Sequence, residues 1–195
     1  TDGRLLALNS YENRVYQVGI EDAAPVVAKF YRPQRWSDAA ILEEHAFAAS
    51  LANQDIPVVP PLEQDGETLH HSGHHRVAVY PCHGGRAPDL DNYELLEQLG
   101  RLVARIHLEG ELSRFKHRPS IDIDSYGTDS VEYLLENDFI PDDNRPAYES
   151  IVDMVLDGVE ACYARAGSVR DIRLHGDFHP GNVLVRGEQL HIVDL

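Results

Sequence analysis

The stretch that decides the fold of this chain reads LHGDFHPGN over residues 174–182, and IVD follows it at residues 192–194. Glycine and proline surround Asp177 and Asn182, so both side chains are expected on a loop rather than inside a regular element. Asp194 comes directly after a short apolar run, where a strand would end. The C-terminal part therefore offers a carboxylate and an amide on one loop, and a second carboxylate after a short strand.

These three groups suit phosphoryl transfer from a nucleotide. An acid on a loop can orient and deprotonate an attacking hydroxyl, and we assign this role of catalytic base to Asp177. The oxygens of Asn182 and Asp194 are hard ligands of the kind that Mg²⁺ prefers, and we predict that both hold this ion beside the nucleotide phosphates. Each residue also has a structural explanation: Asp177 can form a turn, Asn182 can end a loop and Asp194 can end a strand. The spacing H-x-D-x(4)-N favours catalysis, because kinase-like phosphotransferases carry their catalytic loop in this form.

A metallohydrolase centre is the main rival explanation for the same stretch. His175, Asp177 and His179 are residue types that bind zinc or iron. The rest of the chain supplies no obvious H-x-H or H-E-x-x-H partner, and such a centre would leave Lys29 unexplained. We therefore expect His175 and His107 to be structural histidines that hydrogen-bond to the backbone.

Lys29 supports phosphoryl transfer from a distant part of the chain. It is one of only two lysines, and it lies in VVAKF at residues 26–30, close to the V-A-I-K strand whose lysine reaches the α- and β-phosphates of a nucleotide. Its long side chain needs a carboxylate to position it. Glu44 on the following helix is the predicted partner, and Glu43 is the alternative. The structural alternative is a lysine on a solvated strand face.

Two further segments are candidate nucleotide contacts. Residues 9–13 (NSYEN) lie between the first two predicted strands, where protein kinases carry a glycine-rich phosphate loop. They contain no glycine, but backbone N–H groups and the Ser10 hydroxyl can still contact phosphate; a plain polar hairpin turn is the alternative. Residues 79–82 form the predicted hinge, where backbone groups of Tyr80 and Cys82 would pair with an adenine edge.

The N-terminal part reads as a small lobe. Short β-branched and aromatic runs predict strands, a helix capped by Ser37 should end before Pro57, and a hairpin should follow it. The strands are expected at residues 4–8, 14–20, 25–31, 68–71 and 76–80. The linker-like composition of residues 81–88 sets the domain boundary, with a small lobe over residues 1–82 and part of a large lobe over residues 83–195.

The second part reads as mainly helical. Asp91 and Glu94 resemble a capping box at the start of a helix that runs to Gly110. A short helix is expected near residues 130–136, and an amphipathic helix should carry Tyr148 to Cys162 and end near Gly167. Strands are expected at residues 172–174, 183–185 and 191–193. The predicted fold class is α+β and bilobal, with an antiparallel small lobe and a truncated, mainly helical large lobe.

Composition excludes several other classes. The formal net charge of −16 would repel a phosphate backbone, so a nucleic-acid partner is not expected. Cys82 and Cys162 lie far apart and match no metal spacing, which favours a reducing, cytoplasmic setting over a disulfide framework. No apolar run reaches the length that a membrane span requires, so no membrane partner is expected.

With these residues in hand, the chain resembles the aminoglycoside-phosphotransferase/choline-kinase-like group and, more closely, the bacterial stress response kinase A (RdoA-like) family. The first three of the supporting segments are specific to that family rather than to kinases at large. The segments are LNSYENRVYQ at 8–17, VAKFYRP at 27–33, ILEEH at 41–45, GGR at 84–86, HRP at 117–119 and LHGD at 174–177.

The resemblance implies a cytoplasmic kinase of the stress response that depends on Mg²⁺ and ATP and phosphorylates serine or threonine on proteins. It makes Asp177 the proton acceptor, Asn182 and Asp194 the Mg²⁺ ligands, and Ser10 a contact of ATP, and it groups Asp194 with the catalytic residues. Family members continue past the metal-binding acid into helices that complete the large lobe. We therefore expect apolar helix faces to be exposed here, and the catalytic competence of a chain that ends at Leu195 is left open. A small-molecule kinase for an amino alcohol or aminoglycoside, and a non-catalytic nucleotide-binding fragment, are the alternative functions.

Overall fold

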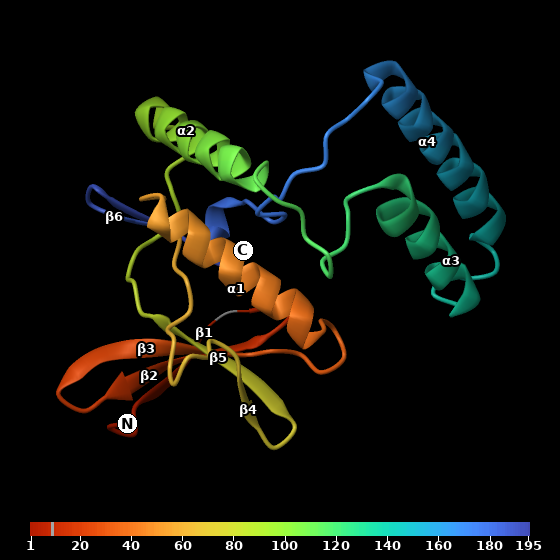
Figure 1. Cartoon of the computed structure of the whole chain (residues 1–195). Helices are drawn as coiled ribbons and strands as arrows, with labels where there is room; N and C mark the ends of the chain where they lie inside the picture. Colours follow the sequence, from red (N-terminus) through yellow and green to blue (C-terminus); the bar gives the residue numbers. More distant parts are fainter. Residues whose placement is uncertain (9) are drawn as a thin grey trace. The chain divides into compact units, whose positions relative to one another are not determined.

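The N-terminal part of the chain forms one antiparallel sheet of five strands in the order β1-β2-β3-β5-β4 (Figure 1). The computed structural model describes residues 1–8 and 10–195, so Asn9 of the expected phosphate loop lies outside the described residues. All five expected strands of this part are present, with ends that differ by a few residues. They are β1 (Leu5–Leu8), β2 (Arg14–Ile20), β3 (Ala23–Phe30), β4 (His70–Ser72) and β5 (His75–Pro81).

Helix α1 (Asp38–Asn53) begins where the sequence predicts. The Ser37 hydroxyl oxygen accepts a hydrogen bond from Ala40 N at 3.1 Å, which satisfies one of the free N–H groups of the first turn. The helix contributes to two apolar clusters. One joins it to the sheet through Ile41, and the other joins it to α2 and to the C-terminal hairpin through Phe47 and Leu51. The helix thus packs against both the sheet and the C-terminal hairpin, and Leu42 and Ala46 lie on its exposed side.

Helix α2 (Tyr93–Gly110) is also present, but its N-cap is Asn92 and not Asp91. Asn92 has an extended backbone, and its side chain accepts a hydrogen bond from Leu95 N at 3.2 Å. Asp91 instead belongs to the preceding turn, where its N–H donates to the Asp89 carboxylate at 3.0 Å. Asp and Asn are both residue types that cap helices, and Asn92 is the one that directly precedes the helix.

The segment that leads into the catalytic loop is not a strand, although residues 172–174 were expected to form one. It runs along the end of α2, and Arg173 N donates to Gly110 O at 3.2 Å. Gly110 permits this approach, because a Cβ atom built there would lie 2.2 Å from the Arg173 carbonyl oxygen. The segment has a helix end as its neighbour rather than a strand, so no ladder forms.

The C-terminal hairpin consists of β6 (Val183–Arg186) and β7 (Gln189–Ile192), and it follows the short 3-10 helix η2 (Pro180–Asn182). Ile192 is fully buried in the cluster that it shares with α1 and α2. It also forms a parallel bridge with Val58, in the loop after α1. The hairpin and α1 are therefore held in one core, and this fixes the loops at their ends.

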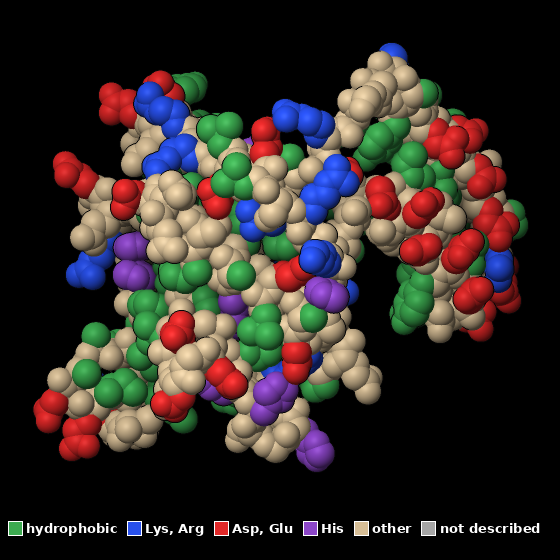
Figure 2. Space-filling view, viewed as in Figure 1, with side chains coloured by type: hydrophobic (Ala, Val, Ile, Leu, Met, Phe, Trp, Pro, Cys, Tyr) green, Lys and Arg blue, Asp and Glu red, His purple; other side chains and the backbone are tan. Residues whose placement is uncertain are grey.

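Residues Arg118–Asp171 form a separate compact unit. It contains a π-helical turn, η1 (Asp124–Thr128), followed by α3 (Asp129–Glu136) and α4 (Arg145–Ala166), so both helices that the sequence predicts here are present. Figure 2 shows acidic side chains spread over this unit. No residue of α3 or α4, all of which are described, is buried. Apolar side chains of α4 are exposed, as expected; they include Ile151, Met154, Val155 and Val159.

The fold class is α+β, as predicted. Contacts divide the chain into the unit just described and a second unit that joins Thr1–His117 to Ile172–Leu195, and the boundary expected after residue 82 stays a prediction. Across residues 1–8 and 10–195, none of the helices combines the length and hydropathy needed to cross a bilayer. Cys82 and Cys162 are both free thiols.

Candidate active site

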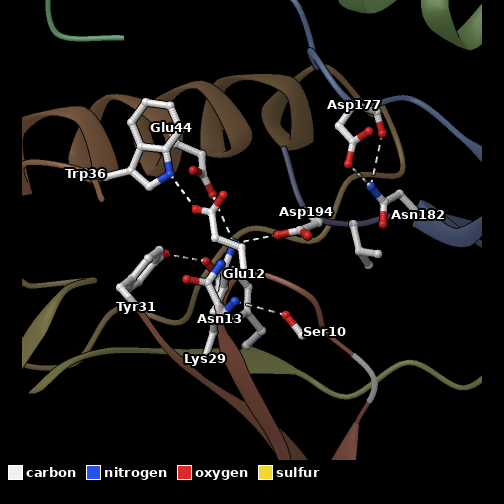
Figure 3. A network of polar contacts seen from close by, with 12 residues as sticks. Ser10, Glu12, Asn13, Lys29, Tyr31, Trp36, Glu44, Asp177, Asn182 and Asp194 are labelled. Atoms are coloured by element: carbon white, nitrogen blue, oxygen red, sulfur yellow. Dashed lines mark hydrogen bonds and ion pairs between the residues drawn. The ribbon is translucent and has the colours of Figure 1, made fainter. Parts of the chain in front are cut away.

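Lys29 is the centre of a buried ionic cluster (Figure 3). It lies near the end of β3, and its side chain is only 10% exposed. Its Nζ lies 2.5 Å from Asp194 Oδ1 and 3.6 Å from Glu44 Oε1, and it sits over the Tyr31 ring at 5.2 Å from the centroid. The lysine therefore connects the sheet, α1 and the segment after β7.

Glu44 and not Glu43 is the partner of Lys29. Glu44 is buried on α1, on the side that also carries Ile41 and Ala48. Glu43 points elsewhere and accepts hydrogen bonds from Lys116 N at 2.7 Å and His117 N at 2.8 Å. Neighbouring helix residues lie on different faces, so only one of these two glutamates can reach the sheet.

The charge state of Lys29 follows from two opposing effects. Burial lowers the pKa of Lys29, but the carboxylates of Glu44 and Asp194 outweigh burial and raise the pKa above its usual value. The ammonium group therefore stays protonated at neutral pH. A buried amine that stays charged between two acids is able to bind a third anion. The oxygens of a nucleotide phosphate are such a partner.

A layer of uncharged polar side chains supports this cluster. Tyr31 Oη lies 2.8 Å from His45 Nε2 and 3.0 Å from Tyr80 Oη, and His45 Nδ1 lies 2.8 Å from Thr68 Oγ1. Burial raises the pKa of both phenols. Burial and, secondarily, the Lys29 charge lower the pKa of His45 to about 4. The layer thus stays neutral and adds no charge to compete with Lys29.

His175 fixes the start of the catalytic loop. Its Nε2 lies 3.1 Å from the Val193 carbonyl oxygen, and its Nδ1 accepts a long hydrogen bond from Asp177 N at 3.4 Å. Burial lowers the pKa of His175, so the ring is neutral. Both ring nitrogens therefore contact backbone, as expected for a structural histidine, and His175 has no nitrogen left to bind the metal of a metallohydrolase centre.

Asp177 and Asn182 lie together on the loop between His175 and β6. Asn182 Nδ2 donates to the Asp177 carbonyl oxygen at 3.0 Å and lies 3.4 Å from Asp177 Oδ2. Asn182 is buried, whereas the Asp177 side chain is 74% exposed. The amide is therefore fixed by its nitrogen, and the acid is accessible to a substrate hydroxyl.

Asp194 adopts a backbone conformation that is uncommon for a side-chain-bearing residue. Its φ is 62°, in the left-handed region, which aspartate tolerates better than most residues. Val193 N donates to Asn182 O at 3.0 Å just before this turn. Such conformations persist where the surroundings enforce them, and they cluster at functional sites.

The oxygen donors fit a hard divalent cation. The Asn182 amide has its nitrogen in use within the loop, so its Oδ1 oxygen remains for a ligand. The Asp194 side chain is 48% exposed and carries a second carboxylate oxygen beyond the one that meets Lys29. Among the described residues, no group of three or more His, Cys, Asp or Glu side chains could hold a metal. A site of few protein oxygens is what Mg²⁺ uses when phosphates and waters complete its shell.

The sequence also predicted three nucleotide contacts in the N-terminal part: Ser10, Tyr80 and Cys82. Ser10 is exposed, and its Oγ accepts a hydrogen bond from Asn13 N at 3.2 Å. The Tyr80 side chain packs against the apolar cluster that includes Ile41. The predicted contact with adenine therefore concerns the backbone groups of Tyr80. Cys82 is half-buried just after β5. The role of each in nucleotide binding stays a prediction.

Two groups of site residues were not predicted. Tyr31 follows Lys29 by two positions, so period-2 alternation could have placed both on one face of the sheet. Glu12 accepts a hydrogen bond from Trp36 Nε1 at 2.8 Å. This contact joins residues 24 positions apart, and nothing in the local sequence indicates it.

Comparison with known proteins agrees with this geometry. Residues 4–195 match the model of a family described as "Phosphotransferase enzyme family". The chain is 41% identical over 186 residues to "Stress response kinase A" of Escherichia coli (strain K12). It is 40% identical over 192 residues to "Serine/threonine protein kinase RdoA" of Salmonella typhimurium (strain LT2). These matches cover 95% and 98% of the chain but only 56% and 58% of the relatives, so the chain spans little more than half of their length.

Solved structures share the fold at low sequence identity. An amicoumacin kinase in complex with AMP-PNP, Ca²⁺ and its ligand superposes with a TM-score of 0.76 at 19% identity, covering 98% of this chain and 58% of that one. A microcompartment-associated aminopropanol kinase gives a TM-score of 0.75 at 19% identity, covering 99% and 64% of the two chains. Both likenesses concern the fold alone.

Proposed function

The chain belongs to the phosphotransferase enzyme family, and from this premise we propose that the full-length protein transfers the γ-phosphate of ATP to a hydroxyl group on serine or threonine of a protein. The observation that carries the proposal is the contact of Lys29 Nζ with both Glu44 and Asp194. An ion pair between a strand lysine and a helix glutamate, beside an acid that could bind Mg²⁺, is the arrangement that protein kinases use for phosphoryl transfer.

Asp177 is the proposed base. In the transfer step, the hydroxyl oxygen of the acceptor forms a bond to the γ-phosphorus, and the bond from that phosphorus to the bridging oxygen of ADP breaks. The proton of the hydroxyl passes to the Asp177 carboxylate. Its exposed side chain, held next to Asn182 at the end of a fixed loop, is accessible for this role.

Lys29 and the loop side chains hold the nucleotide in this proposal. The Lys29 ammonium contacts the α- and β-phosphates, and Glu44 keeps its side chain extended. Ser10 donates its hydroxyl proton to a phosphate oxygen, while backbone groups of Tyr80 and Cys82 pair with adenine. Asn182 and Asp194 would hold Mg²⁺, which would supply positive charge against the charge that builds up on the phosphate oxygens.

The relatives support a protein acceptor. They carry the names "Stress response kinase A" and "Serine/threonine protein kinase RdoA", and their similarity covers nearly the whole chain. By the same inference the protein acts in the cytoplasm during a stress response. The free thiols of Cys82 and Cys162 agree with a reducing compartment.

A small cationic acceptor is the second candidate. The formal net charge is −16, and acidic side chains are scattered over the visible face, most densely on the unit with α3 and α4 (Figure 2); this charge would attract an amine. The structural neighbours include an amicoumacin kinase and an aminopropanol kinase. An amino alcohol or an aminoglycoside carries both the charge and the hydroxyl that such an enzyme would need.

Radiolabelled ATP separates these functions. The full-length protein and its Asp177→Asn variant are each incubated with γ-labelled ATP, Mg²⁺ and an extract from which ATP has been removed. We expect the wild type to label protein bands, and hydrolysis of these bands should release phosphoserine or phosphothreonine. The variant should give no such label. Label in a small soluble product would support the second candidate. Nucleotide binding without any transfer would contradict both and favour a non-catalytic nucleotide-binding role.

A further inference from the structure

The loop between β1 and β2 is held by side chains and not by glycine. Among its described residues, 10–13, Glu12 makes the contacts that reach furthest. Its Oε1 accepts a hydrogen bond from Trp36 Nε1 at 2.8 Å (Figure 3), and its Oε2 accepts one from Arg35 Nε at 3.2 Å. Asn13 adds a third contact, because its Oδ1 accepts a hydrogen bond from Arg32 N at 3.1 Å.

The segment that receives these contacts is itself fixed. Arg76, on β5, has a side chain that is only 14% exposed. It donates to the carbonyl oxygens of Arg32 and Trp36 and to Asp38 Oδ1 at 3.1 Å. Trp36 directly precedes the helix cap Ser37. The loop is therefore tied to a rigid segment at the N-terminus of α1, the helix that carries Glu44.

We propose that Glu12 is a positioning residue, which holds the β1–β2 loop against Trp36 and Arg35 so that Ser10 can donate to a nucleotide phosphate. We name the contacts of Glu12 with Trp36 and Arg35 the Glu12 latch. This inference rests on the proposed function, in which the loop lies against ATP, and it explains how a loop without glycine acquires a defined position.

The charge of Glu12 supports this role. A carboxylate that faced a triphosphate would repel it. The latch directs the Glu12 carboxylate to the Trp36 indole N–H, on the side away from Ser10 (Figure 3). The Arg35 guanidinium gives its charge a partner. The Arg35 guanidinium also stacks on the Trp36 ring at 4.5 Å from the centroid, so both donors are held in one unit.

Ser10 is oriented by the same loop. Its Oγ accepts a hydrogen bond from Asn13 N at 3.2 Å, so the hydroxyl proton is available for donation to another acceptor. Asn13 in turn is tied to Arg32 N. Without the latch, the loop would have to order itself when ATP binds, and part of the binding free energy would be lost to that ordering.

Steady-state kinetics of the full-length protein test the latch. Glu12→Ala should raise KM for ATP about tenfold, the loss expected when a hydrogen bond to a charged group is removed, with kcat changed by less than about threefold. Glu12→Gln keeps an oxygen for the Trp36 indole and should stay within about threefold of the wild-type KM. Glu21→Ala, which changes an exposed glutamate in the next turn of the sheet, is the matched control and should leave KM unchanged.

Trp36 supplies a readout that a general loss of stability would not mimic. It is the only tryptophan among these 195 residues, and the difference in emission between the full-length wild type and its Trp36→Phe variant isolates its signal. A non-hydrolysable ATP analogue should shift the emission of the wild type. In Glu12→Ala this shift should be lost while calorimetry still detects binding. Trp36→Phe should raise KM for ATP as Glu12→Ala does, and the double variant should be no worse than either single one.

The outcomes separate this inference from the proposed function. A wild-type protein that does not bind ATP would overturn both. A wild type that binds and turns over ATP, combined with a Glu12→Ala variant of unchanged KM and unchanged fluorescence response, would overturn the latch alone. Circular dichroism checks folding, and if Glu12→Ala does not fold, the comparison of Glu12→Gln and Trp36→Phe decides in its place.

Discussion

Lys29 Nζ lies 2.5 Å from the carboxylate of Asp194, a residue 165 positions away along the chain. The contact joins the third strand of the sheet to the turn after β7, and Glu44 completes it from α1. Three elements thus meet at one buried amine. Any anionic ligand that reaches Lys29 has to share this amine with the two acids, so the proposed nucleotide site includes the ion cluster.

Lys29→Met should reduce kcat/KM for ATP by about 100-fold or more, because it removes a charge held in place for the phosphates. The change also leaves Glu44 buried without its cation, and we expect a loss of about 3 kcal/mol or more in the free energy of unfolding. Lys116→Met is the control, since Lys116 is the other lysine and is exposed. Equal activity of the two variants would contradict the role of Lys29.

Substituting the two neighbouring glutamates of α1, one at a time, should change kcat/KM for ATP to different extents. Glu44→Gln should lower kcat/KM for ATP about tenfold, since it weakens the ion pair that positions Lys29. Glu43→Gln should leave kcat/KM within about threefold and cost about 1 kcal/mol of stability, because Glu43 accepts two backbone hydrogen bonds. A larger kinetic effect at Glu43 than at Glu44 would show that the pairing is wrong.

His45 should make stability depend on pH. Its pKa is about 4 in the folded protein, whereas an unperturbed histidine has a pKa of about 6.5, so the unfolded chain binds the proton more readily. Stability from this residue is fully present above about pH 6.5 and falls as the pH drops towards about 4, by about 3 kcal/mol in total. Urea unfolding of the wild type and of His45→Gln across this range measures it. Equal slopes in both proteins would contradict the prediction.

Two glycines on α2 should respond differently to alanine. A Cβ at Gly110 would lie 2.2 Å from the Arg173 carbonyl oxygen, whereas nothing lies within 4 Å of a Cβ at Gly100. Gly110→Ala should therefore cost about 1–3 kcal/mol, and the displaced Arg173 segment should also lower kcat. Gly100→Ala should stabilise the helix by about 0.5–1 kcal/mol. Chemical denaturation of both variants checks the contrast.

Local signals predicted much of the fold. The strands, α1 with its Ser37 cap and α4 with its end at Gly167 follow from periodicity and from capping residues, which act over a few positions. The two errors have different causes: one is a choice between two adjacent capping residues, and the other is a neighbour that is distant in sequence. Asn92 rather than Asp91 caps α2, and the residues before His175 pack on a helix end instead of pairing as a strand.

The candidate site was predicted by residue type and spacing, but not by contact. Asp177, Asn182 and Asp194 are recognisable because the chemistry needs those groups within a short stretch of sequence. The choice between Glu43 and Glu44 depends on which helix face meets the sheet. The contacts of Glu12 with Trp36 and of Tyr31 with His45 depend on packing between distant segments, which a single sequence does not encode locally.

The most direct test of the account measures ATP affinity and phosphoryl transfer in the same two proteins, wild type and Asp177→Asn at full length. The amide keeps the size of the side chain but cannot accept the proton at neutral pH. We predict that Asp177→Asn binds ATP within about threefold of the wild-type Kd and loses transfer by about 1,000-fold or more. A variant that retains wild-type transfer would contradict the account, because the base would then lie elsewhere.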